Sequence, residues 1–166
     1  FSPERSAQVL FNSEKQADLI AQILSTMERK GYRGLDVDFE NLTAEQRVPY
    51  AAFLRTLHSR LQPMGYPLMA AVAPKISDDQ PGLLYEGHGY PELGEAVDYL
   101  LLMTYEWGYA AGPPMAVAPL PQVRQVLDYA VTAVPREKLL LGYPGGITVQ
   151  SGSDFSGSGE RSSDSV

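Results

Sequence analysis

The sequence contains no cysteine, which excludes disulfide bonds, zinc–thiolate sites and a thiol nucleophile. Basic side chains are also few: 13 lysines and arginines stand against 20 aspartates and glutamates, giving a formal net charge of −7. This balance argues against a nucleic-acid-binding surface, which needs a clustered basic face, and against anchoring to anionic membranes. No apolar run approaches the roughly 18 residues that a membrane-spanning helix needs. We therefore expect neither nucleic acid nor a membrane among the partners.

The 166 residues contain enough apolar material for one folded domain, since 44% are hydrophobic and 20% are charged. Along the chain, the apolar spacing switches between helical and extended. Capping-box pairs at Ser13–Gln16 and Thr43–Gln46 indicate helix starts, and Gly31 indicates a helix end. The spacing predicts a helix over 13–31, a second helix that ends at Leu61 and a third over 121–134. It predicts strands over 33–41, 68–73, 97–105 and 138–143.

Strands that alternate with helices and are apolar on both faces predict parallel βαβ units with helices covering the sheet. Two long segments, 76–93 and 107–119, each follow a predicted strand. Loops that follow the strands lie at the carboxyl edge of a parallel sheet or barrel, where ligands bind. A ligand site is therefore expected at this edge.

Three acidic residues alternate within the segment Gly34–Glu40. In a strand, Asp36, Asp38 and Glu40 would share one face, with about 6–7 Å of strand rise between neighbours. The intervening residues are apolar and the strand is expected to be central, so this face should be buried and at least one carboxyl pKa should rise. A carboxylic acid with a raised pKa can protonate a leaving-group oxygen near neutral pH.

Other interpretations of these acids are open. They could form a solvated strand face, or their oxygens could bind Mg²⁺ or Ca²⁺. An Asp-x-Asp between apolar residues also resembles glycosyltransferases that hold a metal-bound nucleotide sugar. That interpretation ranks lower, because no basic or glycine-rich segment for a diphosphate lies nearby in the sequence.

Gly34–Glu40 resembles the Asp-Gly-x-Asp-x-Asp-x-Glu signature of glycoside hydrolase family 18, with Arg33 in place of the first acid. The segment Leu101–Tyr109 resembles the Met-x-Tyr-Asp strand of the same family, with Glu106 in place of the aspartate. Together with the segment 112–117, these motifs resemble the spore-cortex-lytic, YaaH-like subgroup of peptidoglycan N-acetylglucosaminidases. The resemblance extends from about residue 1 to residue 142.

The resemblance implies a role for each matching residue. Glu40 would be the general acid, Asp38 would hydrogen-bond the 2-acetamido group of the substrate and Glu40, and Asp36 would share a proton with Asp38. Tyr105 would steady the acetamido oxygen. The candidate substrate-binding residues are Glu106 at a sugar-contact position, Met103 in the pocket floor, Trp107 stacking on a sugar or packing its loop, and Asn41 as a cap or a substrate contact.

The resemblance also implies an α/β fold, a partial (β/α)8 TIM barrel of about four βα units that correspond to strands four to seven. We expect residues 1–144 to form this partial catalytic domain. Residues 145–166 form a predicted disordered tail, since seven serines and three glycines lie between positions 150 and 166. A half barrel leaves open strand edges and an uncovered interior face, so weak activity, no activity or aggregation is expected of this chain alone.

The implied reaction is retaining, substrate-assisted hydrolysis of glycans that contain N-acetylglucosamine, either peptidoglycan or chitin oligomers, without a cofactor or metal. By resemblance, the parent protein would be extracellular, in the cell wall or spore-associated, and joined to LysM-type modules. A chitinase-like lectin that binds such glycans without cleaving them is the main alternative. The presence of Glu40 favours the enzyme, since such lectins typically lose this acid.

Overall fold

The computed structural model describes residues 2–107, 115–142 and 149–150. Its helices are α1 (Pro3–Leu10), α2 (Ser13–Lys30), α3 (Arg47–Leu61), α4 (Tyr90–Ala96) and α5 (Leu120–Ala133), with short 3-10 helices η1 (Ala44–Gln46), η2 (Gln62–Met64) and η3 (Arg136–Lys138). Its strands are β1 (Leu35–Val37), β2 (Leu68–Val72), β3 (Tyr99–Leu102), β4 (Met115–Ala116), β5 (Leu139–Leu141) and β6 (Val149–Gln150).

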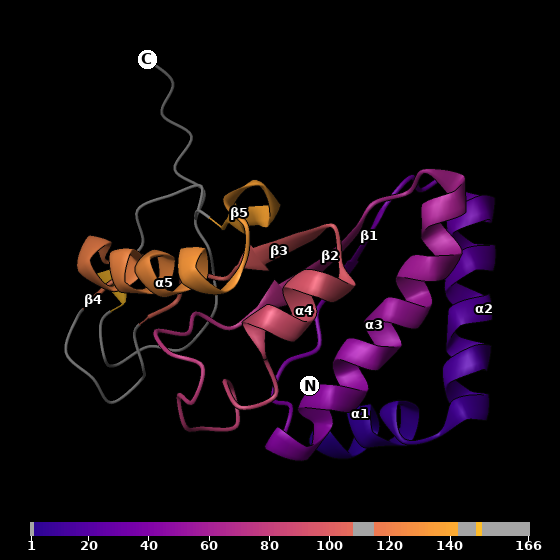
Figure 1. The fold of residues 1–166 in the computed structure, drawn as a ribbon, viewed down its shortest axis with the longest axis horizontal. Helices are drawn as coiled ribbons and strands as arrows, with labels where there is room; N and C mark the ends of the chain where they lie inside the picture. The colour runs from indigo at the N-terminus through magenta and orange to yellow at the C-terminus, as the bar shows by residue number, and fades with distance from the viewer. Residues whose placement is uncertain (1, 108–114, 143–148, 151–166) are drawn as a thin grey trace.

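Four of these strands form a parallel sheet in the order β1-β2-β3-β5. Asp36 lies opposite Met69, Ala71 opposite Leu101, and Leu101 opposite Leu140. In the chain, each of these four strands is separated from the next strand of the sheet by at least one helix, so the predicted parallel βαβ organisation is confirmed (Figure 1). The short β4 and β6 form a separate antiparallel pair.

One face of the sheet carries the hydrophobic core. Val37, Leu68, Leu100 and Leu102 point to this face and pack with the buried side of α3. On the opposite face, Tyr99 and Leu140 are each 39% exposed. Helices therefore cover only one side of the sheet among the described residues, and the side that a complete barrel would enclose is open.

The helix ends show which local signals were correct. Asn12, and not Ser13, caps α2, since its side chain accepts a hydrogen bond from the backbone N–H of Lys15 at 3.0 Å. Gly31 ends the same helix in a left-handed conformation with φ 71°, as predicted. The Thr43–Gln46 capping box is present but opens η1, after which α3 begins.

The strands are shorter than the sequence predicts. β1 covers 35–37 instead of 33–41, and β3 covers 99–102 instead of 97–105. The sequence also gave no indication of α1, and it assigned the start of α4 to a loop. The predicted tail, 145–166, lies outside the described residues except for Val149–Gln150, which form β6.

Candidate active site

The three acids lie at and beyond the carboxyl end of β1. Asp36 lies within the strand, whereas Asp38 and Glu40 follow it outside the strand pairing, in a segment without regular secondary structure. Asp36 and Asp38 are exposed and Glu40 is half-buried. The expectation of a buried face on a central strand is therefore wrong for this chain, because β1 is at the edge of the described sheet and its open face meets solvent.

The carboxyl groups nevertheless perturb one another. Partial burial raises the pKa of Asp36, and the negative charge of Asp38 raises it further. The pKa of Asp38 is also raised by partial burial. The prediction that at least one of these carboxyls has a raised pKa is confirmed. Asp36 and Asp38 therefore hold their protons more tightly than a free aspartate does.

Tyr105 lies beside this row, at the carboxyl end of β3. Burial raises the pKa of its phenol first, and the negative charges of Asp38, Glu106, Asp36 and Glu40 raise it further. The phenol is thus within the field of all three acids of the motif. A neutral hydroxyl that faces several carboxyl groups can donate a hydrogen bond to a polar ligand between them.

Gly142 fixes the place of the Tyr105 ring. A Cβ on Gly142 would lie 2.6 Å from Cε1 of Tyr105 and 2.8 Å from the carbonyl oxygen of Leu102. Thr104 also donates a hydrogen bond from its hydroxyl to the carbonyl of Gly142 at 2.9 Å. Sequence reasoning missed both positions, although a glycine directly after an apolar strand is a signal of close backbone approach.

The residues after Glu40 and Tyr105 both adopt the left-handed backbone conformation. The φ angles are 54° for Asn41 and 60° for Glu106, which are uncommon for residues other than glycine. The chain therefore turns sharply immediately after the two central candidates, and strained positions of this kind cluster at functional sites. Asn41 is half-buried and Glu106 is exposed.

The remaining candidates lie on the β3 side. Met103 is half-buried, and its backbone N–H bonds to the carbonyl of Val72 at 3.1 Å. Trp107 is half-buried and packs against the core, and its indole N–H has no acceptor among the described residues. Gly108 and Tyr109, which complete the second motif, lie outside the described residues.

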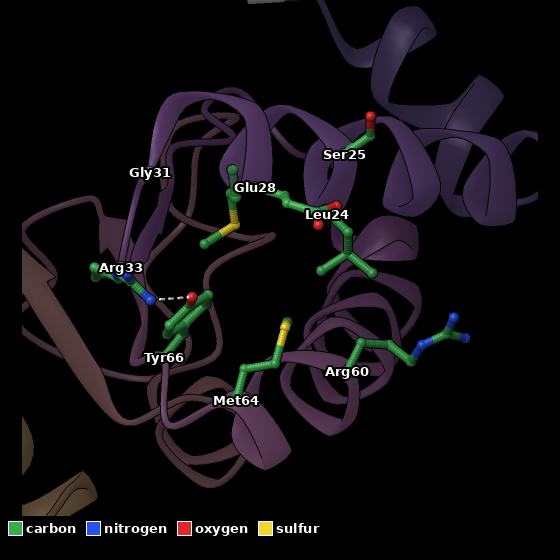
Figure 2. A pocket seen from close by; sticks show the side chains of 9 residues that line it. Leu24, Ser25, Glu28, Gly31, Arg33, Arg60, Met64 and Tyr66 are labelled. Carbon is green, nitrogen blue, oxygen red and sulfur yellow. Dashed lines mark hydrogen bonds between the residues drawn. The ribbon is translucent and has the colours of Figure 1, made fainter.

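A pocket of about 610 Å³ lies at the opposite edge of the sheet (Figure 2). Gly31 and Arg33, which precede β1, line it together with Met64 and Tyr66, which precede β2. The Arg33 guanidinium donates a hydrogen bond to the Tyr66 hydroxyl at 2.7 Å. Because the acids follow the strands, this pocket is not part of the carboxyl site.

The described residues contain neither a metal-binding group of side chains nor a membrane-spanning helix. No group of three histidine, cysteine or acidic side chains there is arranged to hold a metal ion. Nor does any helix in the described part of the chain have the length and apolar character to span a membrane.

The fold and the site define a class: an α/β-barrel type of chain that carries a row of carboxyl groups at the carboxyl edge of its parallel strands. The sequence model described as Glycosyl hydrolases family 18 matches residues 5–161, and the chain belongs to this family. The resemblance inferred from the two motifs is thereby confirmed.

Similar proteins agree with this assignment. The "Cortical fragment-lytic enzyme" of Bacillus subtilis (strain 168) is 40% identical over 142 residues, which are 86% of this chain and 33% of that protein. The crystal structure of the Bacillus cereus spore cortex-lytic enzyme SleL superposes with a TM-score of 0.82 at 39% identity, over 86% of this chain and 33% of that one. The chitinase from Chromobacterium violaceum ATCC 12472 superposes with a TM-score of 0.79 at 29% identity, over 86% and 44%.

The chain spans about one third of the length of the curated relatives it matches. Its sheet corresponds to part of the barrel of its structural neighbours, so the predicted partial-barrel fold is confirmed.

Proposed function

We propose that this chain carries the acid-bearing strands of a glycoside hydrolase that cleaves N-acetylglucosamine-containing glycans. The observation that carries the proposal is the convergence of Asp36, Asp38 and Glu40 with the Tyr105 phenol at one edge of the sheet. A 2-acetamido group offers one carbonyl oxygen and one N–H. A phenol can donate to that oxygen and a carboxylate can accept from that N–H.

Glu40 is the proposed general acid. It gives its proton to the glycosidic oxygen as the bond between that oxygen and the anomeric carbon breaks. The acetamido carbonyl oxygen of the same sugar attacks the anomeric carbon and forms a cyclic oxazolinium. Water then attacks the anomeric carbon and gives one proton to Glu40 as the bond from that carbon to the acetamido oxygen breaks, so the acetamide and the acid are restored and the configuration is retained. In this scheme no second carboxylate acts as nucleophile.

Asp38 and Asp36 support this chemistry. Asp38 orients the acetamido N–H, and its raised pKa allows it to share a proton with Asp36. Tyr105 steadies the acetamido oxygen. Met103, Glu106, Trp107 and Asn41 are the proposed sugar contacts around this centre.

Peptidoglycan is the proposed substrate, including that of the spore cortex. Two groups of relatives, named cortical fragment-lytic enzyme and spore cortex-lytic enzyme, support this choice at 36–40% identity. Chitin oligomers are the alternative, supported by similarity to a chitinase at 29% identity. A location at the cell wall or spore and attachment to LysM-type modules are further proposals of the same kind.

Replacing Glu40 tests the enzyme against the lectin alternative. Glu40→Gln should abolish hydrolysis of peptidoglycan-derived oligosaccharides by the purified protein, measured with excess protein because the open face predicts slow turnover. It should leave oligosaccharide binding intact. The matched control is Glu45→Gln, an exposed acid in η1. Binding without turnover in the unaltered protein would instead support a lectin.

The acetamido group provides a second test. A trifluoroacetamido substrate has a less nucleophilic carbonyl oxygen, so its hydrolysis should be slower by at least about tenfold if that oxygen attacks. Equal rates for the two substrates would contradict substrate assistance.

A further inference from the structure

His88 joins the ends of the two strands nearest the acids. Its ring is fully buried, in the long segment between β2 and α4. The backbone N–H of Ala73 donates to Nδ1 at 2.8 Å, and Nε2 lies 2.7 Å from the carbonyl oxygen of Phe39. Since a carbonyl can only accept, Nε2 must carry the proton and Nδ1 must be bare. The two contacts together define one neutral tautomer.

The bridge that His88 forms between Phe39 and Ala73 lies just beyond the last residues that pair between β1 and β2. The β1–β2 register ends at Val37 opposite Ala70. Phe39 and Ala73 lie beyond that point, and the imidazole spans the gap between them. Phe39 is also the residue between Asp38 and Glu40, so the position of its backbone affects the direction in which each neighbouring acidic side chain leaves the chain.

The surroundings of His88 fix its position on both sides. A Cβ on Gly87 would lie 2.1 Å from Cβ of Leu42, and a Cβ on Gly89 would lie 2.3 Å from Nε of Arg47. At Gly87 the backbone of Leu42 also lies within 2.8 Å of such a Cβ, so only glycine allows this approach, whereas at Gly89 the neighbouring side chains of Arg47 and Glu92 would have to move. The Lys75 ammonium donates to the carbonyls of His88 and Asp78 at 3.0 and 2.7 Å.

Two further contacts hold the base of this bridge. The Tyr90 hydroxyl donates to the carbonyl of Ala73 at 2.6 Å and accepts from the backbone N–H of Lys75 at 3.1 Å. The Ala73 peptide is thus held on both sides, by His88 and by Tyr90. Because the Ala73 backbone fixes the ring through Nδ1, the hydrogen bond from Nε2 fixes the position of the Phe39 carbonyl.

We propose that His88 is a positioning residue for the reaction: its neutral imidazole ties the Phe39 carbonyl to the Ala73 amide and thereby aims Asp38 and Glu40 at the substrate. This inference rests on the proposed function of Glu40. His88 itself touches no substrate in this arrangement, because its ring is buried behind the backbone that it holds.

Two conservative variants separate the two hydrogen bonds. The amide of His88→Gln can reach the Nε2 position and donate to Phe39, whereas the amide of His88→Asn can reach only the Nδ1 position and accept from Ala73. Each variant loses one of the two bonds, so both should lower the unfolding midpoint to a similar extent. The matched control is His58→Gln, at the other histidine of the chain, which lies on α3 and pairs with Asp98 directly before β3.

The expected result is a split between the two variants. His88→Gln should keep kcat within about threefold of the unaltered protein, whereas His88→Asn should lower kcat by about tenfold or more with little change in KM, since small displacements of a catalytic group have large effects. The carboxyl ¹³C signals of Asp38 and Glu40 should shift in His88→Asn and stay in place in His88→Gln and His58→Gln.

Equal losses of kcat in the two His88 variants, in proportion to their unfolding midpoints, would overturn the inference. Unshifted Asp38 and Glu40 signals in His88→Asn would do the same. If the unaltered protein neither binds nor cleaves an N-acetylglucosamine oligosaccharide, the proposed function fails, and the carboxyl signals still decide whether His88 positions the acids.

Discussion

Burial of His88 makes the stability of the chain depend on pH. Desolvation, together with a smaller effect of the Lys75 charge, lowers the pKa of the imidazole to about 4, against the opposing hydrogen bond to Phe39. The Lys75 ammonium donates to the backbone carbonyl of His88, and the Tyr50 ring lies 6.2 Å from the imidazole between centroids. In the unfolded chain the same group titrates near 6.5.

The folded state therefore binds fewer protons than the unfolded state between pH 6.5 and pH 4. The contribution of His88 is complete above pH 6.5 and is lost as the pH falls toward 4. A shift from 6.5 to about 4 corresponds to about 3 kcal/mol of unfolding free energy. The raised pKa values of Asp36 and Asp38 act in the opposite direction, because the folded state binds their protons more readily.

Urea unfolding at pH 7, 5.5 and 4 measures this contribution when the unaltered protein and His88→Gln are compared. Asp36 and Asp38 are present in both, so their effect cancels in the difference. The unaltered protein should lose about 3 kcal/mol more than His88→Gln between pH 7 and pH 4. Identical pH dependence in the two proteins, or a ring ¹⁵N titration near pH 6.5, would refute the reasoning.

Two substitutions test the packing and charge of the carboxyl site. Gly142→Ala should displace the Tyr105 ring, lower the unfolding free energy by about 1–3 kcal/mol and reduce turnover by about tenfold or more. Its control, Gly31→Ala, has open space around the added methyl and φ 71°, so it should cost about 1 kcal/mol with unchanged turnover. Asp36→Asn should remove a carboxyl whose ionised form is disfavoured, and raise the unfolding midpoint at pH 7 by about 1–3 °C while lowering turnover. A lower unfolding midpoint for Asp36→Asn would show that the hydrogen bonds of the Asp36 carboxylate with the backbone of Val37 and Ala71 outweigh its burial and its repulsion by Asp38.

The parallel sheet could be predicted from the sequence because the strands are apolar runs separated by helical spacing, and this pattern depends only on local composition. The place of the acids at the carboxyl edge followed from the same pattern. The length of β1 could not be predicted, because it depends on where its neighbour diverges. Local sequence preferences do not indicate where β1 separates from β2, and this separation leaves Asp38 and Glu40 beyond the paired residues of β1.

The residues that hold the site together were harder to find. The closeness of Gly142 to Tyr105 depends on the packing of two strands about 40 residues apart. His88 is a polar residue in a glycine-rich segment, and nothing in that local pattern indicates its partners. Its two hydrogen bonds join segments that only the tertiary fold brings together.

The place where an amino sugar binds is the most direct test of the account. Backbone amide signals should be followed by NMR while a peptidoglycan-derived N-acetylglucosamine oligosaccharide is added to the protein. The account predicts that shifts concentrate at 38–41 and 103–107, on the carboxyl ends of β1 and β3. Shifts confined to Arg33, Arg60 and Tyr66 in the pocket of Figure 2, or no shifts at all, would contradict it.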